Sequence, residues 1–424
     1  MWRNWEFSEL GWWLVRQKRW KADRSFYAGG QVMFARKISW AVAVVALAGV
    51  ALPWTFGKDE MPAEKIAVPV KQKPVVQLAI LLDTSGSMSG LIDQAKGQLW
   101  KIVNEFAKAK QNGQSPELQV ALYQYGTPSL GADNGYVRQI VGLSTDLDKI
   151  SEELFKLRTD GGDEYCGTVI KHAMENLKWT EGKNVYKAVF IAGNEPFSQG
   201  NVDFRKSCKE AIGKGIMVNT IYCGAANNSE AKEWAEGATL ADGAYMSIDQ
   251  NQQVVHITAP QDKQIAELGE KLNKTYVAYG AKGRESAVRQ QAMDQAATTQ
   301  AAAGSNVQRS VAKANAQYKN AEWDLVDAKK DGTVNLKEMK AEELPEEMRN
   351  LKPEEREKYV AEKQKEREAI QADINKLNKE REVYVAAEQK KQAEASGKET
   401  LDSAMLKVIR TQAEKAELKF EETK

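Results

Sequence analysis

The sequence has few of the residues on which most catalytic sites depend. Among 424 residues there are two histidines, His172 and His256. They lie far apart in the chain, and we expect each to be a packed or surface residue and not a catalytic base. No nucleophile elbow, phosphate-binding loop or HExxH metal motif occurs. These absences argue against an enzyme, including a metal-assisted hydrolase.

The sequence also lacks an excess of charge of either sign. Its 60 Lys and Arg residues balance 59 Asp and Glu residues, which leaves a formal net charge of +1. A balanced chain gives no general electrostatic reason to expect a nucleic acid partner. Charged residues make up 28% of the chain, and its mean hydropathy is negative. This composition excludes a protein that crosses a membrane many times.

Cysteine is scarce. The three cysteines, Cys166, Cys208 and Cys223, have spacings that fit no zinc-binding pattern. Outside the cytoplasm, one disulfide could form among them and would leave one free thiol, although the sequence does not indicate which pair. The alternative is that all three are small buried residues.

One long uncharged run stands out from this polar composition. Residues 38–56 (ISWAVAVVALAGVALPWTF) are long enough to cross a bilayer as a helix. Arg36 and Lys37 precede the run, and Trp40 and Trp54 lie near its ends, where amphipathic rings prefer to lie. The run therefore predicts a single transmembrane helix that acts as a signal anchor.

The basic side of such a helix tends to stay in the cytoplasm. Residues 1–37, which are basic and rich in tryptophan, would then form a cytoplasmic tail. Everything after a linker at residues 57–73 would be extracytoplasmic, in the periplasm or at the cell surface. A cleaved signal peptide and a buried core helix are the alternatives.

The strongest signal follows a second apolar run. Residues 75–82 are mostly apolar, which is typical of a parallel strand that is covered on both faces. Asp83, Ser85 and Ser87 come next, at the carboxyl end of this strand, where open α/β sheets bind ligands. Their side chains all offer oxygen, which suits a hard cation such as Mg²⁺. A helix cap and turn is the alternative.

This Asp-x-Ser-x-Ser pattern resembles the metal-ion-dependent adhesion site (MIDAS) of von Willebrand factor A (VWA) domains, and the resemblance covers about residues 74–258. It implies an α/β domain that binds another protein, often through a metal, and it does not imply catalysis. It also implies that Ser85 and Ser87 bind Mg²⁺, or another divalent cation such as Mn²⁺ or Ca²⁺, directly, while Asp83 acts through water. Such an ion would favour an acidic side chain from a partner at its open position.

Two further loops would complete the site in this family. The second loop usually supplies a threonine, and Thr168 has the matching spacing. Asp163 would serve instead if the Gly-Gly-Asp turn is used, although Asp163 and Glu164 could equally be solvated loop residues. The third loop should supply an aspartate, but the chain has Gly-Asn-Glu-Pro there. Asn194 or Glu195 would have to substitute, which leaves the affinity and the choice of metal in doubt.

The chain divides into two compositional regions. Strand-like and helix-like segments alternate over residues 74–258, which predicts a doubly wound, mainly parallel α/β sheet. Residues 259–424 are dominated by Ala, Glu, Lys, Gln and Arg, which predicts an extended α-helical region. Within it, residues 327–338 imitate a calcium-binding loop, but Lys329 stands where a ligand is required. We therefore expect an Asp-Gly turn there.

The helical region contains one long charged segment. Ile370, Ile374, Leu377 and Tyr384 have the spacing of a single apolar stripe, as in a coiled coil. Arg381 interrupts this stripe, so we expect a helical hairpin or an extended stalk and not a regular coiled coil. A solvated single helix is the alternative.

The sequence therefore predicts a membrane-anchored protein whose VWA-like domain binds another envelope or surface protein through a metal bridge. The alternative is a metal-free scaffold or stalk whose C-terminal helices drive assembly of several copies.

Overall fold

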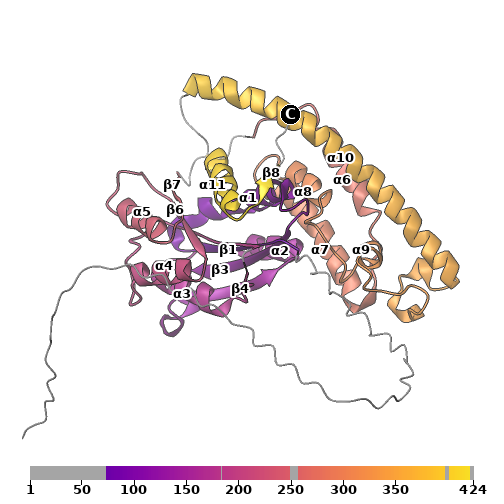
Figure 1. Cartoon of the computed structure of the whole chain (residues 1–424), viewed down its shortest axis with the longest axis horizontal. Helices are drawn as coiled ribbons and strands as arrows, with labels where there is room; N and C mark the ends of the chain where they lie inside the picture. The colour runs from indigo at the N-terminus through magenta and orange to yellow at the C-terminus, as the bar shows by residue number, and fades with distance from the viewer. Residues whose placement is uncertain (1–72, 183, 249–255, 397–400, 421–424) are drawn as a thin grey trace, which may run out of the picture. The chain divides into compact units, whose positions relative to one another are not determined.

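The structure, a computed structural model, describes residues 73–182, 184–248, 256–396 and 401–420 (Figure 1). The predicted transmembrane segment at 38–56 and the tail before it lie outside these residues. Within the described part, no helix is both long enough and apolar enough to cross a membrane. This finding contradicts the predicted single-pass localisation, which is withdrawn. The long helix near the C-terminus, residues 353–396, is highly charged, and it has buried positions among exposed ones.

A six-stranded sheet forms the centre of the fold (Figure 1). Its strands are β1 (Val75–Asp83), β3 (Glu117–Tyr125), β4 (Val137–Ser144), β5 (Val185–Gly193), β6 (Met217–Tyr222) and β7 (Tyr245–Ser247). They lie in the order β4-β3-β1-β5-β6-β7, and all neighbouring pairs are parallel except β3 and β4. The mainly parallel α/β fold predicted from the sequence is confirmed, including an edge strand at β4.

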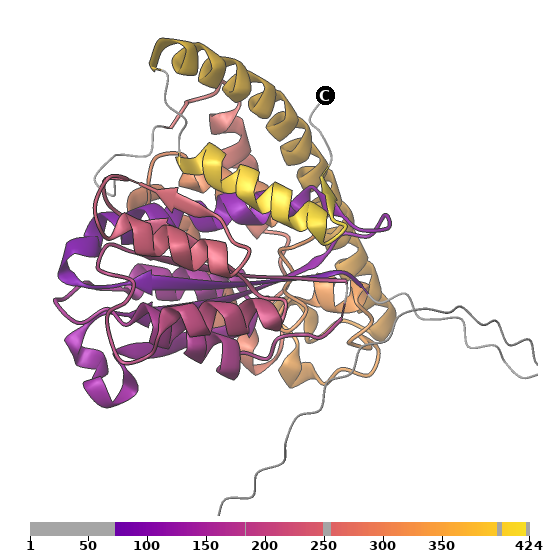
Figure 2. The same ribbon diagram turned by 60° about the vertical axis from the view of Figure 1, so that its left-hand side comes forward.

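Helices cover both faces of this sheet (Figure 2). One face is covered by α1 (Ser89–Ala107), α2 (Leu147–Lys156) and α11 (Leu401–Lys415), and the other by α3 (Cys166–Asn176), α4 (Phe204–Gly213) and α5 (Ala231–Leu240). Alternate β1 residues serve the two cores: Leu78 packs on the α1 side, and Ala79 on the α3 side. Burial on both faces explains why β1 is apolar almost without interruption.

The strand ends align at one edge of the sheet. Asp83, the last residue of β1, is paired with Tyr125, the last residue of β3. Leu82 is paired with Ala192 of β5. The loops that follow these three strands therefore begin beside one another, and they place their side chains at a common edge.

The remaining helices pack against one another and against α1 and α2 (Figures 1 and 2). They are α6 (Asp262–Asn273), α7 (Gly280–Thr299), α8 (Ser305–Lys313), α9 (Leu325–Lys330) and α10 (Pro353–Ser396). Gly304 has a left-handed conformation, with φ of 81°, and separates α7 from α8. After α11, β8 (Lys419–Phe420) pairs with β2 (Ala109–Lys110), which ties the end of the described chain to the segment after α1.

The predicted helical C-terminal region is confirmed. Its long helix α10 packs against α6 and α8, however, and does not extend away from the rest of the protein as a stalk. Ile374 is fully buried against α6 and α8, and Ile370 and Leu377 pack beside it. Arg381, which interrupts the stripe, is buried and donates from Nε to Asp262 Oδ1 of α6 at 2.6 Å. Tyr384 lies beyond this contact and is 37% exposed. The apolar stripe of α10 therefore packs against other helices of the same chain.

The calcium-like segment forms a turn, as the Asp-Gly interpretation predicted. Gly332 adopts φ of 69° after α9. Asp327, the first residue of the imitated loop, lies within α9 and accepts from the guanidinium of Arg367 at 3.0 Å. Its carboxylate is therefore committed to an ion pair. Between α8 and α9 the chain is not helical, and Tyr318 and Trp323 are buried there.

Candidate metal-binding site

The β1 motif forms a tight turn of oxygen atoms at the edge of the sheet. Asp83 and Ser85 are buried, whereas Ser87 is exposed. Asp83 Oδ1 accepts from the backbone N–H of Ser85 at 2.7 Å, and the hydroxyl oxygens of Ser85 and Ser87 lie 3.2 Å apart. A short 3-10 turn (Gly86–Met88) then leads into α1. The structure thus brings together the three residues predicted from the first loop.

The second loop reaches this turn through a residue that the sequence did not single out. The backbone N–H of Asp160 donates to Thr84 O at 3.0 Å, which holds the loop against the end of β1. Glu164, only 3% exposed, lies close enough to Asp83 and Ser85 for both side chains to act on the pKa of its carboxyl. Its own N–H donates to Gln199 Oε1 at 2.6 Å. Glu164 is thus the second-loop side chain at the site.

The two residues predicted from the second loop lie against a different turn. Thr168 is in the first turn of α3, and its methyl group would lie 2.7 Å from a Cβ added to Gly135. The carboxylate of Asp163 lies close enough to the hydroxyl of Tyr136 to raise its pKa. The family spacing pointed to Thr168. The only local signal for Glu164 was its place just before the buried start of α3.

The third loop supplies a neutral oxygen. Asn194 Oδ1 accepts from the hydroxyl of Ser87 at 3.3 Å, so Asn194 is beside the first loop as predicted. Glu195 is close enough for its negative charge to act on Asp83 and Glu164. Its backbone oxygen accepts from Trp234 Nε1 at 2.9 Å, which fixes the path of the loop.

Two glycines keep space open around the Asp83 carboxylate. A Cβ on Gly126 would lie 2.6 Å from Asp83 Oδ1 and 2.9 Å from Glu164 Cγ. A Cβ on Gly193 would lie 3.1 Å from Asp83 Oδ2. Any other residue at these positions would occupy the volume beside the two carboxylates. Gly126 and Gly193, at the ends of the neighbouring strands, therefore leave the space beside Asp83 open because they have no side chain.

The carboxyls of Asp83 and Glu164 both have raised pKa values. Burial raises the pKa of Asp83 to about 6. Burial, and then the neighbouring charge of Asp83, raise the pKa of Glu164 to about 9. Two buried carboxylates in contact repel each other, so one proton or one cation must lie between them. The two carboxyls therefore favour binding of a proton or a cation at this site.

These residues fit a hard divalent cation. Asp83 Oδ2 is buried and has no hydrogen-bond donor among the described residues. Around it are carboxylate, hydroxyl and amide oxygens, which Mg²⁺, Mn²⁺ and Ca²⁺ prefer as ligands. The described residues contain no cluster of three or more His, Cys, Asp or Glu side chains suited to a metal. A metal at the strand ends would therefore depend on the serine and asparagine oxygens as well.

The cysteines and histidines do not contribute to this site. All three cysteines are free and buried, which agrees with the alternative of small buried residues and not with a disulfide among them. His172 lies 3.4 Å from the Tyr123 hydroxyl, and burial lowers its pKa. His256 Nε2 is paired with Asp262 Oδ2 at 3.0 Å. Both histidines are thus packed residues, as expected.

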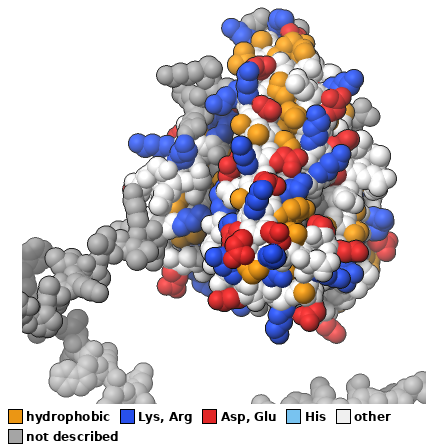
Figure 3. All heavy atoms as spheres, turned by 90° about the vertical axis from the view of Figure 1, so that its right-hand side faces the viewer, with side chains coloured by type: hydrophobic (Ala, Val, Ile, Leu, Met, Phe, Trp, Pro, Cys, Tyr) orange, Lys and Arg blue, Asp and Glu red, His pale blue; other side chains and the backbone are white. Residues whose placement is uncertain are grey.

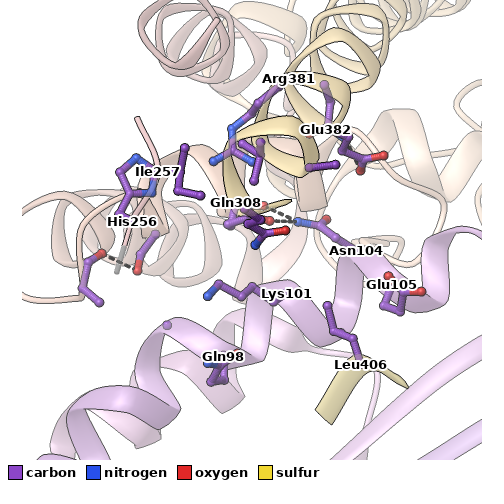
Figure 4. Close-up of a pocket in the computed structure, with 18 of the residues that line it drawn as sticks. Gln98, Lys101, Asn104, Glu105, His256, Ile257, Gln308, Arg381, Glu382 and Leu406 are labelled. Atoms are coloured by element: carbon purple, nitrogen blue, oxygen red, sulfur yellow. Dashed lines mark hydrogen bonds between the residues drawn. The ribbon is translucent and has the colours of Figure 1, made fainter. Parts of the chain in front are cut away.

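A large cavity lies elsewhere, between α1, α8, α10 and α11 (Figure 4). It has a volume of about 580 Å³, which is a common size for a ligand site. Its charged groups mostly have partners within the chain: Arg410 pairs with Glu105, and Lys108 lies 2.8 Å from Glu382. Asn104 donates to Gln308 across its floor at 2.9 Å. The strand ends, with an unsatisfied buried oxygen, are the better candidate site.

Comparison with known proteins found solved structures that are similar to part of this chain. The solved structure of BatB from Bacteroides thetaiotaomicron is 17% identical, with a TM-score of 0.33, over 41% of this chain and 90% of that chain. An aerotolerance-related membrane protein from Bacteroides fragilis is 17% identical, with a TM-score of 0.30, over 41% of this chain and 92% of that chain.

Proximal thread matrix protein 1 from the mussel byssus, with a zinc-occupied MIDAS motif, is 15% identical, with a TM-score of 0.34. That match covers 42% of this chain and 43% of the mussel protein. No curated protein sequence shows a significant match. The model of the von Willebrand factor type A domain matches residues 77–260. This part of the chain is therefore a VWA domain.

Proposed function

We propose that this VWA domain binds another protein through a divalent cation held at the ends of β1 and β5. Asp83, Ser85, Ser87 and Asn194 would hold the ion, with Glu164 and Glu195 beside it. VWA domains are generally interaction modules and not enzymes. The ion would supply a coordination position that a partner can complete, and the residues of the chain would position it and exclude water on the buried side.

One observation carries this proposal. Asp83 Oδ2 is buried at the sheet edge and has no hydrogen-bond donor among the described residues. A buried anionic oxygen without a partner costs free energy unless a proton or cation neutralises it. The exposed hydroxyl of Ser87 on the outer side would leave the ion accessible to a partner.

The first experiment measures metal binding by the full chain. Titration calorimetry with Mn²⁺ should give binding by the wild type and weaker binding by Ser85→Ala and Ser87→Ala. Ser89→Ala is the matched control, because Ser89 is an exposed serine at the start of α1. If none of the serine variants alters the affinity, the ion does not lie in this turn.

The second experiment concerns the partner. Proteins that are recovered with the chain in Mg²⁺ should be lost in EDTA and lost with Ser87→Ala, while Ser89→Ala retains them. Recovery that is the same with and without the metal would contradict a metal-assisted contact.

A metal-independent scaffold is the second candidate function. The interaction between the hydroxyls of Ser85 and Ser87, and the bond from Ser87 to Asn194, close the turn without an ion. The C-terminal helices are less suited to assembling copies of the chain than the sequence predicted, because Ile374 and its stripe pack within the chain. Sedimentation of the full chain tests this: a stable oligomer without metal would favour the scaffold.

A further inference from the structure

We propose that the cavity between α1, α8, α10 and α11 binds a small carboxylic acid with an apolar body, whose carboxylate is held by the guanidinium group of Arg381 (Figure 4). The cavity has a volume of about 580 Å³, which lies within the range of sites for small molecules. This site would be separate from the strand ends, and its ligand would not require a metal.

Arg381 is almost completely buried but makes a single hydrogen bond among the described residues. Its side chain is 7% exposed, and it points from α10 into the cavity (Figure 4). Its Nε donates to Asp262 Oδ1 at 2.6 Å. A guanidinium group has five N–H donors in one plane. The N–H groups of Nη1 and Nη2 therefore have no acceptor in the described part of the chain.

Asp262 fixes the orientation of this guanidinium group. Its Oδ2 lies 3.0 Å from His256 Nε2 and accepts from the backbone N–H of Ala259 at 3.1 Å, so both of its oxygens are engaged. Because a guanidinium group is planar and rigid, a bond through Nε leaves the edge formed by Nη1 and Nη2 on another side of the group. A carboxylate binds such an edge with two parallel hydrogen bonds.

The carboxylates that line the cavity do not serve this edge. Glu105 pairs with Arg410, and Glu382 lies 2.8 Å from Lys108. Neither forms a hydrogen bond with Arg381 among the described contacts. Buried donors without acceptors cost free energy, and the oxygens of a bound carboxylate would remove this cost.

Gln308 of α8 offers a further donor to the same ligand. Asn104 Nδ2 donates to the backbone oxygen of Gln308 and to its Oε1, both at 2.9 Å. A backbone oxygen can only accept, so the amide of Asn104 is fixed, and Gln308 must turn its own oxygen toward it. The Nε2 of Gln308 is then left without an acceptor among the described residues, and Gln308 lines the cavity (Figure 4).

The cavity also has apolar walls, which indicate the rest of the ligand. Ile257, Val385 and Leu406 line it and are partly buried. Val383, which also lines it, is 55% exposed. A hydrocarbon body attached to the carboxylate would cover these side chains, whereas an inorganic anion would leave them in water. One guanidinium group balances one negative charge, which favours a monocarboxylate over a phosphate.

The outer surface gives no comparable preference for an anion on the face shown in Figure 3. Basic and acidic side chains lie intermingled there without a large area of one sign. A mixed surface of this kind has no general attraction for anions. Selection of a carboxylate would therefore depend on the cavity.

Titration calorimetry of the full chain with hexanoate tests the class of ligand. Hexanoate should bind, and three other probes should each bind about tenfold more weakly or less. These are hexanamide, which has the same shape without the charge, acetate, which has the charge without the apolar body, and inorganic phosphate. Equal affinity for any of them would contradict the proposed ligand. No binding of hexanoate would mean that solvent alone satisfies Arg381, and the inference would be wrong.

Variants of the cavity test the position of the ligand. Arg381→Lys keeps a positive charge beside Asp262 but removes the edge with two N–H groups, so the hexanoate affinity should fall by about tenfold or more. Gln308→Glu adds a carboxylate that repels the ligand, and it should weaken binding as well. Arg284→Lys is the matched control, because Arg284 is exposed on α7 and does not line the cavity.

The control should bind hexanoate with the affinity of the wild type. Thermal unfolding verifies that each variant folds. Unchanged hexanoate affinity in both Arg381→Lys and Gln308→Glu would place the ligand outside this cavity and overturn the inference.

Discussion

Arg309 of α8 donates from Nη1 to Asp148 Oδ1 of α2 at 2.6 Å, and the two side chains are only 1% and 6% exposed. The same guanidinium reaches Asp294 Oδ1 of α7 from Nε at 2.5 Å and lies 4.6 Å from the ring of Trp100 in α1. Two of these elements belong to the VWA domain and two to the C-terminal helices. The two regions therefore share one buried polar centre.

Replacement of Arg309 by a neutral residue should destabilise the VWA domain and the C-terminal helices together. Arg309→Met leaves Asp148 without its charged partner and leaves Asp294 paired with Lys313 alone, and loss of one member of a buried ion pair costs about 3–5 kcal/mol. Urea unfolding, followed by tryptophan fluorescence, should show one transition at a lower midpoint.

Lys206→Ala is the control for this prediction, because Lys206 is 77% exposed and lies 3.8 Å from Glu210. The change in stability should be below about 1 kcal/mol. Two separate transitions in the wild type, with only one of them affected by Arg309→Met, would show that the helices fold independently.

The same centre predicts a dependence of stability on pH. Burial alone would raise the pKa of Asp294, but the charges of Arg309 and Lys313 lower it below its ordinary value of 3.8. A carboxyl whose pKa is lower in the folded state contributes stability that is complete above the unfolded-state value. That contribution is lost as the pH falls through the folded-state value.

Asp294→Asn removes this contribution. The difference in unfolding free energy between wild type and variant should be constant near about pH 6 and shrink toward about pH 3. Urea midpoints measured across this range test the prediction. A difference that grows as the pH falls would mean that the pKa of Asp294 is raised and not lowered.

The sequence predicted the sheet well because its signals are local. The apolar run at residues 75–82 became β1, which ends one residue later, at Asp83. A parallel strand that is buried on both faces must be apolar along its length, and this pattern is visible in one segment. The motif at Asp83 was equally visible.

The rest depended on contacts between distant residues. Arg381 interrupted the apolar stripe in the sequence, but its partner Asp262 is more than one hundred residues earlier. The sequence offered Thr168 or Asp163 from the second loop, but the position of Glu164 beside Asp83 depends on the path of this loop, which contacts Thr84 through Asp160. No pattern within a single segment contains this information.

Gln412 of α11 forms three hydrogen bonds with residues of the sheet. Gln412 accepts from the hydroxyl of Tyr186 at 3.0 Å and exchanges two hydrogen bonds with the amide of Asn219, at 3.1 and 2.6 Å. Gln412→Leu would leave the Tyr186 hydroxyl and the Asn219 amide N–H without these partners, while Asn219 Oδ1 would keep the backbone N–H of Ala244; we expect a cost of about 1–3 kcal/mol. Hydrogen exchange in α11 should become faster.

Thr411→Ala is the neighbouring control. Thr411 is exposed and bonds only within its own helix, to Lys407 O. Its exchange rates should match those of the wild type. Unchanged protection of α11 in Gln412→Leu would mean that apolar contacts alone, such as those of Ile409 and Ala413, hold the helix.

The buried thiols should be unreactive in the folded protein. Burial raises the pKa of Cys208 to about 12, and it raises the pKa values of Cys166 and Cys223 as well. Ellman's reagent should therefore label none of them until denaturant is added, and then all of them with or without prior reduction. Ser229→Cys, in an exposed loop, is the positive control. Labelling that increases after reduction would indicate a disulfide.

The space above the carboxylates gives the most selective test of the site. Gly126 has φ of 84°, and a Cβ there would lie 2.6 Å from Asp83 Oδ1. Gly126→Ala should displace Asp83 and Glu164 and weaken Mn²⁺ binding by about tenfold or more, since metal sites depend on ligand position. Titration calorimetry measures this loss.

Gly131→Ala separates backbone strain from the loss of space. Gly131 has φ of 78°, and a Cβ there meets nothing within 4 Å among the described residues. Both variants should lose stability, by about 1–3 kcal/mol, because an alanine is strained at positive φ. Only Gly126→Ala should lose the metal. Equal Mn²⁺ affinity in the two variants would show that the volume beside Asp83 is not where the ion binds, and the site would then have to lie outside this turn.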